Sequence, residues 1–212
     1  MLRKKLNKIR TPQEISKNSI IFNAVVFLVL GILLGIFSKW LDNLAIDDTV
    51  WWQHFIGLLD LGNFMSGFSI WLLLSLIIAV FSNAPLSAAV NVFLFLLGMT
   101  VSYHVYTVIF SGCNPMGYMM IWYGITLASP ILAFICWYAR SRSFVSMLLS
   151  GIILSVMVLS CFGVGFWYFD IKSILDTFAF IMAVVVLHTN LFSTIGALII
   201  AVALAFGVRI VF

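Results

Sequence analysis

Charged side chains are scarce in this sequence. Asp, Glu, Lys and Arg make up 8% of its 212 residues, against about a quarter in soluble domains, whereas 64% of the residues are hydrophobic. The hydrophobic residues form repeated runs long enough to cross a hydrocarbon core of roughly 30 Å, which takes about 20 helical residues. This composition excludes an ordinary soluble domain and predicts an integral membrane protein.

The alternation of polar and apolar residues that is typical of strands is also missing. We therefore predict an all-α fold, a polytopic transmembrane helical bundle with its amino terminus in the cytoplasm. The expected spans are 19–38, 61–81, 86–110, 117–139, 144–169, 173–188 and 191–210. Residues 1–18 then form a basic cytoplasmic arm and residues 19–212 a single transmembrane domain. Within that domain, 43–58 is expected to lie as a short interfacial segment on the outer surface.

Motifs for catalysis and for cofactor binding are lacking. The sequence has no GxSxG, HExxH, GxxxxGK[ST] or GxGxxG motif, and its three cysteines have no ligand spacing. His54, His104, Asp60 and Asp170 could approach one another near the outer surface, but no spacing supports a metal site. We expect no catalytic residues, no metal and no cofactor, although an embedded enzyme of unfamiliar type stays open as a third functional hypothesis.

The charges that are present are distributed unevenly. Six of the eleven basic residues lie within the first seventeen positions, which favours contact with anionic lipid over nucleic acid. With the amino terminus inside the cell, eight basic residues face the cytoplasm and six of the seven acidic residues face outward. The positive-inside rule therefore predicts a multi-pass protein of the plasma membrane with its carboxyl terminus outside.

Three local features carry structural predictions. Lys39 and Trp40 end the first span, where a snorkelling amine and an indole are typical anchors at the outer face. GILLG places Gly31 and Gly35 four residues apart, which favours close packing within the bundle over a face for a partner protein. Pro130 should kink the fourth span, and Ser129 should help to satisfy the backbone carbonyl that the proline frees.

Polar residues within the spans are the best functional clue, because an unpaired polar group in hydrocarbon is costly. In the third span polar residues recur at spacings of three and four and share one helix face. Three other spans also bring polar and aromatic residues to the outer level. The predicted site is an outward-facing cavity lined by Asp60, Asn63, Thr100, Tyr103, His104, Thr107, Trp122, Tyr123, Trp167 and Asp170.

The same residues also have a purely structural interpretation. Tyr and Trp at helix ends are commonly belt residues, and a lone His104 can simply bond a neighbouring helix. Two further functional hypotheses follow. The leading one is a solute-binding or transport-related component that takes a small solute from the outer side. The alternative is an accessory subunit, of an immunity or regulator type, that binds another membrane protein through the GILLG face or the outer loop.

At GIFSKWLD, SGFSIW, NVFLFLLGMTVSYHVYT and FWYFD the chain resembles members of an uncharacterised family of small bacterial integral membrane proteins, mostly from Gram-positive organisms. That resemblance implies a multi-pass build over nearly the whole chain and carries no assigned activity. In size and build alone the chain is also similar to the substrate-binding subunits of energy-coupling-factor transporters, which bind vitamins from the outer side.

Overall fold

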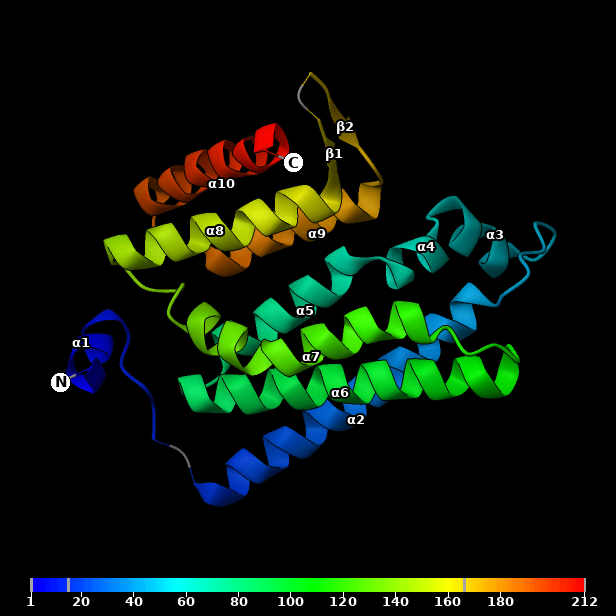
Figure 1. Cartoon of the computed structure of the whole chain (residues 1–212), viewed down its shortest axis with the longest axis horizontal. Helices are drawn as coiled ribbons and strands as arrows, with labels where there is room; N and C mark the ends of the chain where they lie inside the picture. Colours follow the sequence, from blue (N-terminus) through cyan, green and yellow to red (C-terminus); the bar gives the residue numbers. More distant parts are fainter. Residues whose placement is uncertain (1, 15, 166, 212) are drawn as a thin grey trace. The chain divides into compact units, whose positions relative to one another are not determined.

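The computed structural model describes residues 2–14, 16–165 and 167–211, with the side chains of 2–5 and 209–211 left aside. Helices dominate the chain (Figure 1). They are α1 (Leu2–Ile9), α2 (Lys17–Asp42), α3 (Trp51–Leu58), α4 (Leu61–Ser66), α5 (Phe68–Phe81), α6 (Pro85–Phe110), α7 (Met116–Trp137), α8 (Phe144–Cys161), α9 (Ile174–Leu187) and α10 (Leu191–Val211).

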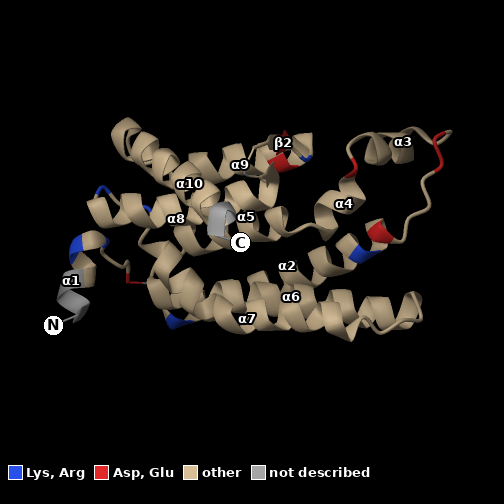
Figure 2. Cartoon of the chain, turned by 45° about the horizontal axis from the view of Figure 1, so that its top comes forward, with Lys and Arg blue, Asp and Glu red and all other residues tan. Residues whose placement is uncertain are grey.

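Five helices, α2, α6, α7, α8 and α10, are long and apolar enough to cross a bilayer. Two more apolar helices, α5 and α9, have 14 residues each, or about 21 Å at 1.5 Å per residue. Within the described residues, the prediction of a helical chain with several candidate membrane-spanning helices is therefore confirmed. Charged residues concentrate near the ends of the helices, and most of each long helix is free of them (Figure 2).

Two predicted spans are shorter than expected. The 61–81 span is interrupted at Gly67, whose extended backbone ends α4 before α5 begins. The 144–169 span ends at Cys161, because Phe162 turns to extended backbone and starts a hairpin. That hairpin pairs β1 (Phe162–Val164) with β2 (Phe169–Ile171) in antiparallel register, Gly163 opposite Asp170. The all-α prediction is thus corrected to a nearly all-α fold with one short hairpin.

The chain forms two compact units, one of 1–14, 69–88 and 133–212, the other of 15–68 and 89–132. We call them unit 1 and unit 2 and describe each by itself. In unit 1, α8 packs against α9 and α10 through small residues. Ala197, Ala201 and Ala205 of α10 are at most 2% exposed, and a Cβ on Gly151 of α8 would lie 2.6 Å from the Ile200 side chain. Close helix packing of this kind is typical of membrane bundles.

In unit 2, α2 and α6 cross with their backbones in direct contact. A Cβ on Gly31 would lie 2.0 Å from the carbonyl oxygen of Phe95, and one on Gly98 would lie 2.5 Å from that of Leu28. Gly35 makes the same approach to Met99, at 2.4 Å. GILLG therefore packs within the bundle, as predicted, and the alternative in which its glycines bind a partner protein is wrong because α6 occupies that face.

The prediction that Ser129 satisfies the carbonyl freed by Pro130 is also confirmed, whereas the predicted kink stays a prediction. Pro130 lies inside α7 and has no N–H to donate to the carbonyl of Thr126, four residues earlier. The Ser129 hydroxyl donates to that carbonyl at 2.8 Å instead. Ser129 is 3% exposed, so the freed carbonyl is satisfied without water.

The segment between α2 and α4 contains a short turn and one short helix. Asp47 accepts hydrogen bonds from the Thr49 amide at 3.0 Å and from the Thr49 hydroxyl at 2.7 Å. Both bonds favour the ionised carboxylate and hold the pKa of Asp47 below its ordinary value. The following α3 presents Trp51 and Phe55, which are 82% and 57% exposed. Exposed rings on a short helix suit the interfacial role predicted for 43–58.

Candidate functional site

The predicted polar stripe lies on the second half of α6, in unit 2. Thr100 and Thr107 are buried, at 0% and 2% exposure, so this face of α6 packs against protein. The Thr100 hydroxyl lies 3.2 Å from the Thr126 hydroxyl of α7, and the Thr107 hydroxyl donates back to the Tyr103 carbonyl at 2.8 Å. The threonines therefore serve helix contact, while Tyr103 and His104 lead into two polar networks.

The first network joins α6 to the beginning of α7 through His104. Its Nδ1 lies 2.9 Å from the Tyr123 hydroxyl and its Nε2 lies 2.9 Å from Oδ1 of Asn114. An amide oxygen can only accept, so Nε2 carries the hydrogen, and in the neutral ring Tyr123 donates to Nδ1. Both ring nitrogens of His104 therefore have a partner, one on α7 and one in the turn before it.

The second network joins α6 to the end of α2 and involves Lys39. Lys39 is only 9% exposed, forms an ion pair with Asp42, and has its ammonium 5.4 Å from the centre of the Tyr103 ring. The Tyr103 ring therefore lies beside the Lys39–Asp42 ion pair. The prediction that Lys39 snorkels to the headgroups as an anchor is therefore corrected: its side chain faces protein and is neutralised there.

The ends of α2 and α6 are tied together next to these networks. The Asn43 side-chain amide donates to the Ser111 hydroxyl at 3.0 Å, and on α2 the Ser38 hydroxyl donates to the Met65 carbonyl of α4 at 3.0 Å. These bonds fix the helices that carry the two networks. We refer to the following residues as the α2–α6 polar cluster: Lys39, Asp42, Asn43, Tyr103, His104, Ser111, Asn114 and Tyr123.

Other predicted site residues of unit 2 bond locally or pack. Asn63 donates to both carboxylate oxygens of Asp60, at 2.8 and 3.0 Å, and the two residues are exposed around the start of α4. Trp122 is 8% exposed, and its ring packs against Phe68 and Tyr118 with centroids 5.6 and 6.4 Å away. We find no interaction of these residues with the α2–α6 polar cluster among the contacts of residues 16–68 and 89–132.

Trp167 and Asp170 belong to unit 1, on the hairpin between α8 and α9. Trp167 is 90% exposed, and Asp170 lies on β2 opposite Gly163. His104 belongs to unit 2, so the hypothesis that Trp167 and Asp170 share one cavity with it stays a prediction. The sequence alone did not identify Lys39 and Asp42 as members of the α2–α6 polar cluster. Both residues are recognisable in the sequence as charges at the end of a span, but the sequence does not show the rotation of α2 that turns Lys39 toward protein.

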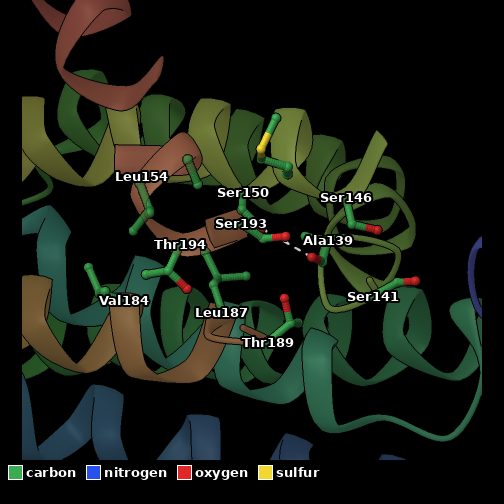
Figure 3. Close-up of a pocket in the computed structure, with 12 residues that line it drawn as sticks. Ala139, Ser141, Ser146, Ser150, Leu154, Val184, Leu187, Thr189, Ser193 and Thr194 are labelled. Carbon is green, nitrogen blue, oxygen red and sulfur yellow. Dashed lines mark hydrogen bonds between the residues drawn. The ribbon is translucent and has the colours of Figure 1, made fainter. Parts of the chain in front are cut away.

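A small cavity lies in unit 1 between α8, α9, α10 and the turn after α7 (Figure 3). It leaves about 10 Å³ for the centre of a water molecule, which is room for about one water. Its lining is rich in hydroxyls, but Ser150 already donates to the Ala139 carbonyl at 3.1 Å and Ser146 to the Tyr138 carbonyl at 2.8 Å. This cavity is too small for an organic solute.

Comparison of the chain with protein-family models, with curated proteins and with solved structures returned no match. Within residues 2–14, 16–165 and 167–211, no group of three or more His, Cys, Asp or Glu side chains is placed to hold a metal ion. The α2–α6 polar cluster is the candidate functional site of unit 2.

Proposed function

We propose that this protein is a multi-pass membrane component that binds a small charged solute at the α2–α6 polar cluster and takes part in its transport. The observation that carries the proposal is Lys39, a cation with 9% exposure at the end of an apolar helix, held against Asp42 and the Tyr103 ring. Ionisable groups enclosed within membrane helices are costly and commonly belong to solute or ion pathways.

The chemistry of the cluster suits a zwitterion. Lys39 offers an ammonium to a carboxylate, Asp42 offers a carboxylate to an amine, and the Tyr103 ring can cover a cation. A zwitterionic solute that inserts between Lys39 and Asp42 replaces one ion pair by two and leaves no enclosed charge unpaired. We therefore expect an amino acid or a related small zwitterion rather than a neutral sugar.

The topology in this proposal places the amino terminus in the cytoplasm and the cluster in the outer half of the membrane. The contacts Gly31 to Phe95 and Asn43 to Ser111 show that α2 and α6 run in the same direction. This parallel arrangement supports a proposed return of the chain across the bilayer between them, through the apolar 61–81 segment. With α9 counted in the same way, seven segments cross, and the carboxyl terminus lies outside.

The topology can be tested with reporters fused to the full chain. Alkaline phosphatase is active only outside the cytoplasm. We expect a phosphatase fused after Phe212 to be active and one placed in the 140–142 turn to be inactive. An inactive phosphatase at the carboxyl terminus would remove the seven-span arrangement.

The binding proposal is tested by thermal stability of the purified protein with amino acids, amines and vitamins. A ligand at 100 times its Kd stabilises the folded state by about 2.7 kcal/mol, a shift of several degrees. We expect the shift from the best zwitterion to be lost in Lys39→Met and in Asp42→Asn. Lys17→Gln, an exposed lysine at the other end of α2, is the matched control and should keep it. No shift with any compound, or a shift kept in Lys39→Met, would refute the proposal.

A second candidate function is favoured by α3. Leu58 is 73% exposed on the same short helix as Trp51 and Phe55, so α3 presents an apolar surface that another membrane protein could cover. In this alternative the chain is an accessory subunit. A partner that copurifies in mild detergent in stoichiometric amounts, and is lost with Trp51→Ser and Leu58→Ser, would support it over solute binding.

A further inference from the structure

The basic arm before α2 is bound to unit 1 through Arg10. The Arg10 guanidinium donates to the Trp137 carbonyl at 2.6 Å and lies 4.2 Å from the centre of the Trp137 ring. The Ser141 hydroxyl donates to the Ile9 carbonyl, and the Gln13 amide donates to the Asn83 carbonyl at 2.9 Å. These contacts fix Arg10 against the turns that follow α5 and α7.

A second guanidinium lies close to the first. Arg140 follows Trp137 by three residues, and its guanidinium carbon is 4.6 Å from the centre of the Phe81 ring. Both guanidiniums are therefore stacked on aromatic rings, which orients their planes and limits their mobility. Burial, and to a smaller extent the neighbouring Arg140 charge, lower the pKa of Arg10.

No carboxylate in the described part of the chain forms an ion pair with either arginine. Arg10 uses one donor on an uncharged carbonyl, whereas a guanidinium offers five. Neither guanidinium therefore has a counter-ion within the described residues, and a guanidinium can donate bidentate hydrogen bonds to a phosphate group.

We infer that Arg10 and Arg140 form a binding site for a phosphate group, and that its occupant is the headgroup of an anionic phospholipid. The lipid source is favoured by what surrounds the arginines. Both lie just beyond the end of α7, a helix long enough to span the bilayer, and Phe81 and Phe144 beside the two turns are 58% and 68% exposed. Exposed apolar rings next to the charges suit acyl chains rather than a phosphate free in water.

The test measures lipid binding to the full-length, delipidated protein by native mass spectrometry in a neutral detergent. The lipids are dioleoyl phosphatidylglycerol and dioleoyl phosphatidylcholine, and inorganic phosphate is the competitor. We expect phosphatidylglycerol to bind at least about tenfold more tightly than phosphatidylcholine and to lose about fivefold in affinity with Arg140→Gln. Arg142→Gln is the matched control, an exposed arginine two residues away, and should change the affinity less than about twofold.

Arg10→Lys is the second variant, because Arg10→Gln could release the arm from Trp137. Lysine keeps the charge but cannot form the bidentate contact, so we expect a loss of several-fold with unchanged thermal stability in the absence of lipid. Equal losses with Arg140→Gln and Arg142→Gln, or equal affinity for the two lipids, would overturn the site. Complete displacement of phosphatidylglycerol by millimolar phosphate would overturn the identification of a lipid as the occupant.

Discussion

The contact between α2 and α6 leads to a quantitative prediction at Gly31. An alanine there would place its Cβ 2.0 Å from the carbonyl oxygen of Phe95, where contacts shorter than 3.0 Å are essentially never seen. The neighbouring atom is backbone, so the side chain cannot simply rotate away. The two helices would have to separate by more than about an ångström, and overpacking of this kind costs typically about 1–3 kcal/mol.

A second effect of the substitution has the opposite sign. Alanine favours a helix over glycine by about 0.8–1.0 kcal/mol, whatever the surroundings. Gly124→Ala on α7 isolates this effect, because nothing lies within 4 Å of a Cβ built on Gly124. The difference between Gly31→Ala and Gly124→Ala therefore reports the helix contact alone. Because the obstacle is backbone, we expect that difference to be about 2–3 kcal/mol.

The assay is thermal unfolding in detergent, followed by circular dichroism and by size-exclusion chromatography. For a chain of this length, about 1 kcal/mol corresponds to about 2–4 °C in Tm, so Gly31→Ala should melt about 4–12 °C below Gly124→Ala. Gly98→Ala should behave like Gly31→Ala. The double variant should lose less stability than the sum of the two single losses, because one separation of α2 from α6 makes room for both methyl groups. If Gly31→Ala and Gly124→Ala melt within about 1 °C of each other, the backbone contact is wrong.

Two further predictions concern single hydrogen bonds. Ser129→Ala should lower the free energy of unfolding by about 1 kcal/mol, because it leaves the Thr126 carbonyl without a donor. Adding Pro130→Ala should restore the lost stability, because alanine returns an N–H to that carbonyl. Denaturant unfolding of the two single variants and the double variant measures the coupling between the two positions. Asp47 has a folded pKa below its unfolded value, so its turn is stabilised above the unfolded pKa and that contribution is lost as the pH falls through the folded pKa. Thr49→Val removes the hydroxyl donor and keeps the amide donor, so it should raise the pKa of Asp47 part of the way toward the ordinary value; a carboxyl-carbon NMR titration would show this, and an unchanged pKa would contradict the assigned hydroxyl bond.

The sequence predicted the parts of the fold that depend on hydrophobic length and on local backbone chemistry. Apart from α8, which ends at Cys161, the long helices begin and end within a few residues of the expected spans; the packing of Gly31 and Gly35 followed from their spacing, and the role of Ser129 from its place before Pro130. The hairpin after Cys161 was missed because three-residue strands carry no alternation signal.

The candidate site was predicted only in part. His104, Tyr103 and Tyr123 were found because they recur at helical spacing in adjacent spans. Lys39 was assigned to the lipid boundary, since a lysine next to a tryptophan at a span end has the same sequence signature whether it faces headgroups or protein. The side that such a residue faces depends on helix rotation, which is set by the contact of Gly31 and Gly35 with α6.

The crossing of α2 over α6 also has a consequence for how the protein should be handled. A narrow strip of α2 meets its neighbours, while many of its larger apolar side chains, such as Ile21, Phe22 and Leu33, are 63%, 68% and 59% exposed. In the proposed membrane arrangement acyl chains cover these side chains, so the choice of detergent should affect α2 first. Short-chain detergents should loosen the half of α2 that carries Ile21 and Phe22, because the end that carries Lys39 is held by α4 and α6, and reconstitution into lipid nanodiscs should tighten it.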